Sequence, residues 1–169
     1  MTEFRSMRRK RQLLPQEESI KILENATAGT LALLGDGGYP YSLPISYVYR
    51  DGSLFFHSAL KGHKVDAIRG CEKASFSVIE QDDVKPREFT TYFRSVVCFG
   101  RIHIIKDDEE KMAALRRLAE RYNPGDEEGF RQEVKKDFAH MQMIRLDIEH
   151  MTGKEAIELL RARRDEAKG

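Results

Sequence analysis

A short basic turn at residues 58–64 is the part of this sequence best suited to bind an anion. It follows two strand-like segments, 41–50 and 53–57, and helical spacing resumes with Val65 after Gly62. A helix is therefore predicted to begin near Gly62, where free backbone N–H groups and the helix dipole favour a phosphate. The candidate phosphate ligands are Lys64, His63 and Ser58, with Lys61 in reserve. The alternative interpretation is an ordinary strand–turn–helix corner with solvated charges.

His57 ends the strand that leads into this turn, directly after two phenylalanines. A histidine titrates near neutral pH, so it can transfer a proton during a reaction. Taken alone, a histidine in this position is more often a hydrogen-bonded residue of the core or rim than a catalyst.

Alternating apolar residues and turn residues predict the elements that must position this turn. Strands are predicted over residues 29–34, 41–50, 53–57, 73–80, 89–93, 95–106 and 142–149, with 89–93 and 95–106 forming one bent strand or two joined at Arg94. Helices are predicted over residues 15–25, 63–69, 107–122, 127–138 and 155–167. Tight turns at 36–38 and 51–52 make the first strands an antiparallel meander, and 81–88 is predicted to be a polar loop.

About six short strands with inserted helices favour a mainly β (α+β) fold, a six-stranded antiparallel split β-barrel with peripheral helices. We expect a basic arm at residues 1–14, one domain at 15–157 and a helical tail at 158–169.

The composition describes a soluble globular domain with no membrane span. The 169 residues are 40% hydrophobic and 34% charged, enough for one core without a metal or disulfide. No apolar run is long enough to cross a membrane, and Pro15 ends the apolar pair before it, so no signal peptide is expected. The expected compartment is the cytoplasm. A net charge of +1 gives no global argument for nucleic acid.

The two cysteines, Cys71 and Cys98, form neither a CxxC motif nor a disulfide framework. Both are expected to be reduced, with Cys98 a small buried residue of a strand. A catalytic cysteine is disfavoured because neither has an activating neighbour in the local sequence.

Four segments, 38–49, 55–66, 92–102 and 148–155, resemble in order those of the pyridoxamine-phosphate-oxidase-like FMN-binding split barrels. Within that group the resemblance is to the nitroimidazole-resistance proteins, and it runs from about Met7 to about Ile157. It implies a flavoprotein with FMN at the interface of a homodimer and a small-molecule substrate.

The resemblance also assigns cofactor-binding residues. It implies that the strand Pro44, Ile45, Ser46 and Tyr47 lines the flavin ring, with backbone groups bonding the ring edge. Arg94 and Ser95 fall where the family places another flavin-adjacent strand, although Arg94 could equally form a surface ion pair. His57 keeps the family's five-residue spacing to the glycine of the turn, which implies a place beside the flavin and a proton for an acceptor such as a nitro group.

Residues 151–154 also match the family pattern, and they would be either a loop closing the other subunit's pocket or only a turn before the last helix. Two departures stand out. There is no tryptophan to stack on a flavin, and His63 replaces a more permanent cation, so phosphate affinity should weaken as His63 loses its proton.

Other functions stay open at this point. A split barrel can be non-catalytic or bind haem, FAD or a deazaflavin. Oxidation of pyridoxamine phosphate itself is less expected, because the chain lacks an arginine- and tryptophan-rich carboxy-terminal segment. A nucleic-acid-binding module would use the basic arm, Arg5, Arg8, Arg9, Lys10 and Arg11. We expect instead a solvated tail or a dimer clasp.

Overall fold

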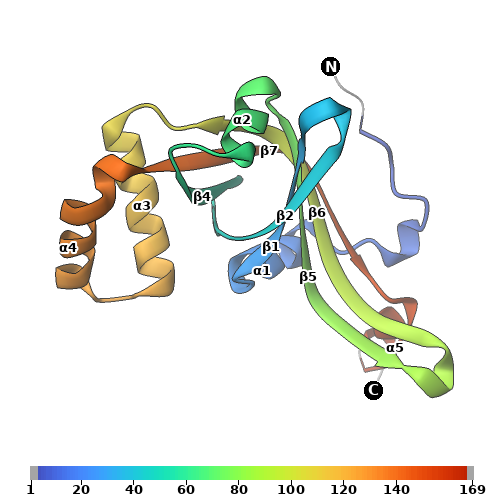
Figure 1. Ribbon diagram of the computed structural model, residues 1–169. Coiled ribbons are helices and arrows are strands. Elements are labelled where there is room, and N and C mark those ends of the chain that lie inside the picture. The colour runs from blue at the N-terminus through green and yellow to red at the C-terminus, as the bar shows by residue number, and fades with distance from the viewer. Residues whose placement is uncertain (1–3, 167–169) are drawn as a thin grey trace.

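Seven antiparallel strands form one sheet in the computed structural model, which describes residues 4–166 (Figure 1). The strands are β1 (Ala28–Leu34), β2 (Pro40–Ser46), β3 (Val48–Arg50), β4 (Ser53–Ala59), β5 (Lys73–Lys85), β6 (Thr90–Ile104) and β7 (Met141–Glu155). Their order in the sheet is β2-β1-β5-β6-β7-β4-β3. The predicted split-barrel class is confirmed, but with seven strands rather than six, because the predicted strand 41–50 divides in two.

Tyr47 is the residue at which that strand divides and the sheet closes. β2 and β3 lie at the two ends of the strand order, and only Tyr47 separates them in the chain. The Tyr47 ring is fully buried and meets Phe76 edge-on at 4.8 Å between ring centroids. Its hydroxyl donates to the carbonyl oxygen of Leu23 at 2.8 Å. Because one buried residue joins both edges, the sheet must curl into a barrel.

The turn between β3 and β4 follows from local chemistry. Asp51 and Gly52 have φ angles of 49° and 80°, and Arg50 pairs with Ser53. Positive φ at both central residues is the type I′ geometry that a two-residue hairpin favours. The predicted Asp-Gly turn is therefore confirmed.

Two segments predicted to lie outside strands are strands in the structure. β5 continues to Lys85 and pairs with β6 as far as Thr90, so most of the predicted polar loop 81–88 belongs to a long hairpin (Figure 1). β7 continues to Glu155, and Thr152 pairs with Val97 of β6, so residues 151–154 are neither a loop nor a turn. Ladder hydrogen bonds to β6 hold both segments extended, although β5 there is rich in polar residues.

The α-helices agree with the predicted positions. They are α1 (Gln16–Asn25), α2 (His63–Gly70), α3 (Asp108–Tyr122), α4 (Glu127–Asp137) and α5 (Ile157–Glu166). The side chains of Asp107 and Asp126 cap α3 and α4 by accepting from the N–H groups of Glu110 and Gly129. In Figure 1, α3 and α4 stand together on one side of the barrel, while α5 lies beside the long β5–β6 hairpin on the other. Among residues 4–166, no helix is both long and apolar enough to cross a membrane.

The basic arm is docked on the barrel along part of its length. Residues 10–12 form a short 3-10 helix, Leu13 pairs with Lys154 of β7, and the N–H of Leu14 donates to the carbonyl oxygen of Gly153 at 3.0 Å. Gln12 and Leu14 are buried, whereas the cations for which a solvated tail or dimer clasp is expected, Arg5, Arg8, Arg9, Lys10 and Arg11, are exposed. Residues 1–3 of the predicted arm, like 167–169 of the predicted tail helix, lie outside the described residues.

Both cysteines are free thiols, as expected. Cys98 belongs to the barrel core, and burial raises the pKa of its thiol to about 12. A thiol with that pKa carries almost no thiolate at neutral pH, so Cys98 is a packing residue.

Candidate functional site

The alternation of side chains along β4 decides which predicted residues can share a site. Leu54 and Phe56 point into the main barrel core, whereas Phe55 packs in a second apolar cluster with Leu118 of α3. Successive side chains of a strand point to opposite faces. His57 therefore lies on the outer face with Phe55 and is exposed, whereas Ser58 points inward and is buried.

His57 lies in the wall of a cavity of about 480 Å³ between the barrel and the helices α3 and α4. Ser46, at the end of β2, lines the same cavity. The remaining lining residues come from α3, α4 and their connection: Leu115, Leu118, Ala119, Tyr122, Asn123, Asp126, Gly129, Phe130 and Glu133. An apolar lining with a few polar groups is typical of sites for small molecules and cofactors.

β2 presents its residues to two different environments. Ile45 packs partly buried against the core, while Pro44 and Ser46 are exposed on the outer face. β2 is an edge strand paired only with β1, and edge strands accept proline where the missing N–H faces away from the partner. The outer edge at Pro44 and Ser46 is therefore open to a ligand. Tyr47, by contrast, has its phenol ring buried in the core, so this side chain cannot contact the ring of a ligand bound in the cavity.

Tyr122 is a cavity residue that was not among the predicted site residues. Its hydroxyl lies 2.6 Å from the carbonyl oxygen of Tyr47 and 2.7 Å from that of Thr27. Burial raises the pKa of this hydroxyl, which therefore stays protonated and can donate. Tyr122 thus ties the end of α3 to the residue at which the barrel closes, and it fixes one wall of the cavity.

The amino end of α2 provides an anion-binding geometry. Gly62 precedes the helix with φ of 126°, and no side chain caps the first turn. The first N–H groups of a helix have no acceptor within it, so they are free to bond an anion. Lys64 is half-buried and forms no ion pair within residues 4–166, and burial lowers the pKa of its amino group. The one acid of the first turn, Asp66, pairs with Arg69. An uncapped helix end and a partly desolvated lysine without an ion pair favour a phosphate here.

Two other predicted phosphate ligands have partners within the protein. The His63 ring stacks on Tyr41 at 4.0 Å between centroids, and its Nε2 lies 3.8 Å from the Asp36 carboxylate. The Ser58 hydroxyl donates to the carbonyl oxygen of Ala59 at 3.1 Å. Lys61, the reserve candidate, is exposed. Lys64 is therefore the predicted ligand best placed for a phosphate.

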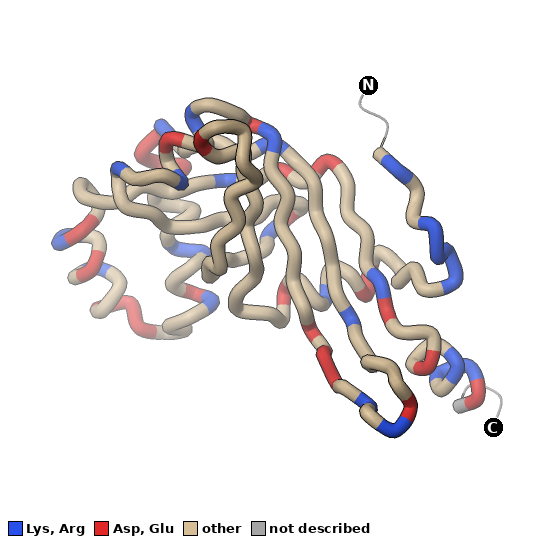
Figure 2. Tube along the Cα trace, turned by 45° about the vertical axis from the view of Figure 1, so that its right-hand side comes forward, with Lys and Arg blue, Asp and Glu red and all other residues tan. Residues whose placement is uncertain are grey.

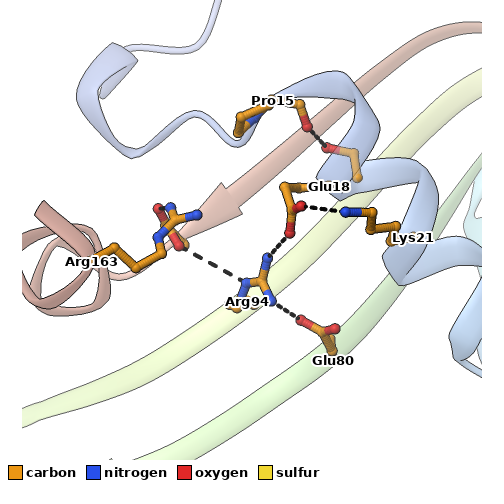
Figure 3. Close-up of polar contacts among 8 residues, drawn as sticks. Pro15, Glu18, Lys21, Glu80, Arg94 and Arg163 are labelled. Carbon is orange, nitrogen blue, oxygen red and sulfur yellow. Dashed lines mark hydrogen bonds and ion pairs between the residues drawn. The ribbon is translucent and has the colours of Figure 1, made fainter. Parts of the chain in front are cut away.

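Arg94 lies in a junction of carboxylates (Figure 3). Its guanidinium donates to Glu18 of α1 at 3.1 Å, and it lies 2.9 Å from Glu80 of β5 and 4.0 Å from Glu155 of β7. Arg163 of α5 also binds Glu155. The structure therefore matches the ion-pair alternative for Arg94, and a phosphate would have to displace carboxylates. Ser95, the next residue, is half-buried in β6 between Ile79 and Lys154.

The fold and these sites define a split-barrel protein with a helical cover over one outer face and an uncapped helix amino end beside it. The model of the pyridoxamine 5'-phosphate oxidase family matches residues 15–155, and the chain belongs to that family. No curated protein matches the chain.

Several solved structures share the fold. A candidate 5-nitroimidazole antibiotic resistance protein from Bacteroides thetaiotaomicron is 21% identical over 84% of this chain and 85% of its own, with a TM-score of 0.68. A FAD and haem binding protein from Mycobacterium smegmatis is 25% identical over 86% of this chain and 73% of its own, with a TM-score of 0.75. A FAD-binding protein from Mesorhizobium loti is 25% identical over 86% and 97%, with a TM-score of 0.59.

Proposed function

We propose that this protein binds FMN and reduces small molecules, with nitroaromatic compounds such as nitroimidazoles as the candidate acceptors. Family membership and the flavin-binding neighbours support a flavin. The observation that carries the proposal is the cavity in which Ser46 and His57 meet under α3 and α4.

The residues present fit the two ends of FMN. The isoalloxazine ring needs an apolar slot with a few polar groups, and Leu115, Leu118 and Phe130 supply apolar surface beside Ser46 and His57. Asp126 and Glu133 also line the cavity, and their charge disfavours a phosphate there. The phosphate would instead lie at the amino end of α2.

The chain between the two sites is short enough for one cofactor to contact both. The five residues from His57 to Gly62 can span at most about 18 Å. A mononucleotide in an extended conformation therefore suits the pair of sites, with Lys64 and the N–H groups of α2 at its phosphate.

His57 would hold the proton that the substrate needs. When bound, FMN would supply the electrons for the reduction. The exposed imidazole of His57 can carry a proton on a ring nitrogen and release it to an oxygen of an acceptor in the cavity. The Ser46 hydroxyl can orient the same acceptor.

The flavin-bearing unit would be a homodimer, with the cofactor at the subunit interface. The outer faces of β5 and β6 carry exposed apolar side chains at Ile79, Val84 and Phe99, and Phe89 at the hairpin tip is 98% exposed. A second subunit packed along this hairpin would bury these side chains. Analytical ultracentrifugation of the purified protein tests the oligomeric state. A monomer at micromolar concentration would contradict this part of the proposal.

The test of the cofactor is a visible absorption spectrum of the purified protein before and after addition of FMN and removal of the excess. Flavin bands at one FMN per chain support the proposal. FAD, haem and a deazaflavin are tested in parallel, because a neighbour binds FAD and haem. A haem Soret band, or uptake of none of these, would overturn the FMN assignment.

The test of the reaction is reduction of a nitroimidazole by the FMN-loaded protein with a chemical reductant. His57→Gln should slow turnover at least about 100-fold, the usual worth of a positioned proton donor, while FMN stays bound. Lys61→Gln, an exposed change beside the turn, is the matched control. Equal turnover of His57→Gln and wild type would remove His57 from the mechanism.

A further inference from the structure

A second pocket lies between the basic arm and Ile157, the first residue of α5. The arm and α5 are on the side of the barrel away from α3 and α4 (Figure 1). We call this second pocket the arm pocket. It has a volume of about 480 Å³, and its lining residues are Arg8, Arg9, Lys10, Arg11, Gln12 and Ile157. Four of these six residues carry a positive charge.

The four cations of the arm pocket have no protein counter-charge. Within residues 4–166, none of them forms an ion pair, although many other lysines and arginines of the chain do. Cations held close together repel one another, and this repulsion is relieved when an anion binds between them. The pocket is therefore arranged to gain from an anionic ligand.

Gln12 adds an unpaired polar group to this pocket. It is 4% exposed, and its Oε1 atom is buried with no hydrogen-bond partner. Buried polar atoms in native proteins are almost always paired, and an unpaired one costs about 1–3 kcal/mol. A ligand that carries a hydroxyl or amino group beside its anionic group would satisfy the amide and the cations together.

The arm pocket is fixed by backbone contacts. The N–H of Gln12 donates to the carbonyl oxygen of Arg9 at 2.9 Å, and Leu14 is bound to Gly153 of β7. The short helix of residues 10–12 contacts α5. The cations therefore do not have to be ordered from a disordered tail when a ligand binds, which reduces the entropic cost of binding.

The surroundings favour a compact ligand over a long polyanion. The β5–β6 hairpin on the same side of the molecule carries both signs of charge (Figure 2), with the acids Asp82, Asp83 and Glu88 beside the bases Lys85 and Arg87. A nucleic acid extending past the pocket would meet mixed charge there and no continuous basic track, and the net charge of the chain is only +1.

We propose that the arm pocket binds a phosphorylated small molecule of nucleotide size, with the cations on its phosphates and Gln12 on a hydroxyl or amino group. This site is separate from the cavity of His57 and from the amino end of α2. It does not depend on the flavin assignment.

The test is isothermal titration of the full-length protein with ADP. The triple variant R8A/R9A/R11A should weaken ADP binding at least about 30-fold, because charge-assisted hydrogen bonds are lost. The control K73A/K106A/K135A removes the same charge from exposed residues that do not line the pocket, and it should bind like wild type. Lys64→Ala should also bind ADP like wild type, which separates this pocket from the flavin site. Equal binding by R8A/R9A/R11A and wild type would overturn the proposal.

Gln12→Leu tests the amide separately from the charges. It should weaken ADP binding about threefold to tenfold while leaving thermal stability unchanged or raised, because it removes an unpaired buried group. Orthophosphate should bind the wild type at least about tenfold more weakly than ADP, because it offers fewer contacts. Equal affinities would overturn the nucleotide assignment, as would tight binding of a single-stranded oligonucleotide or of phosphatidylserine vesicles without binding of ADP.

Discussion

Two basic side chains predicted to bind the cofactor occupy opposite environments. Arg94 lies among carboxylates from α1, β5 and β7, whereas Lys64, the second residue of α2, forms no ion pair within residues 4–166. Both are partly buried. A buried cation that already has anions stabilises the fold, while one that has none is available to a ligand. Whether a cation already has an ion-pair partner in the protein is thus a better guide to ligand binding than its position in a sequence motif.

Glu155 explains why Arg94 is needed where it is. This carboxylate is 1% exposed, and it lies between Arg94 and Arg163. A buried charge is costly without a partner. Hydrogen bonds from Lys21 and Arg94 also hold the pKa of Glu18 below its ordinary value. The junction thus joins α1, β5, β6, β7 and α5 through charges.

The largest expected effect comes from breaking this junction. Arg94→Ala should lower the free energy of unfolding by about 3 kcal/mol, since it leaves the buried Glu155 with one partner fewer. Chemical denaturation measures this. Arg101→Ala, which breaks exposed ion pairs to Glu72 and Glu149, is the control and should change little. If Arg94→Ala folded with wild-type stability and lost FMN instead, the contrast between the two cations would be reversed.

Lys64→Ala should act on binding more than on stability. The loss of a charge-assisted contact to the phosphate should weaken FMN binding about 10-fold to 100-fold. Quenching of flavin fluorescence in a titration measures the dissociation constant. Lys61→Ala serves as the control at an exposed lysine three residues away. An unchanged FMN affinity in Lys64→Ala would place the phosphate elsewhere.

Gly62→Ala should weaken the same end of α2 through the backbone. Its φ of 126° is a conformation that other residues avoid, so alanine should cost about 1–2 kcal/mol of stability and weaken FMN binding severalfold. Gly70→Ala, at the other end of the same helix, has no positive φ and no close neighbour for a Cβ, so it should be neutral. Thermal melting of the two variants with and without FMN compares them, and equal behaviour would show that the turn is not strained.

The smallest expected effect is a pH dependence that Lys64 imposes. Burial lowers the pKa of Lys64, so the folded chain releases this proton at a lower pH than the unfolded chain does. The unfolded state then binds more protons, and stability relative to Lys64→Met rises with pH between the folded and unfolded pKa values. FMN affinity should fall over the same alkaline range, because the phosphate loses its cation. Parallel denaturation and binding series at increasing pH test both signs, and a rise in affinity with pH would contradict them.

Much of the fold follows from local signals. The Asp51-Gly52 turn, the caps before α3 and α4, and the alternation of β4 depend on neighbours in the chain. The ends of β5 and β7 could not be predicted in this way. Both are held by hydrogen bonds to β6, and their own residues are too polar or too mixed to indicate a strand.

The candidate site likewise has a part that local sequence predicts and a part that depends on long-range contacts. The turn at Gly62 and the histidine before it can be found from spacing, but the cavity exists because α3 and α4 fold back over the outer face of the barrel. The ion-pair partners of Arg94 could not be predicted from the local sequence either, since Glu18 is 76 residues away in the chain. Strand alternation could have separated His57 from Ser58 at the outset, because adjacent residues face opposite sides.

The pairing of β4 with β7 has a consequence for how this chain folds during synthesis. Ser53 donates to Asp147 across this ladder, 94 residues apart in the chain. Until the ribosome has released residues 141–155, β4 can pair only with β3, and its other edge stays open. Contacts of such long range also slow folding. The barrel can therefore close only after β7, the second-to-last element, has been synthesised. Until then the free edge of β4 is exposed, and a chaperone that covered it would be most useful at this stage.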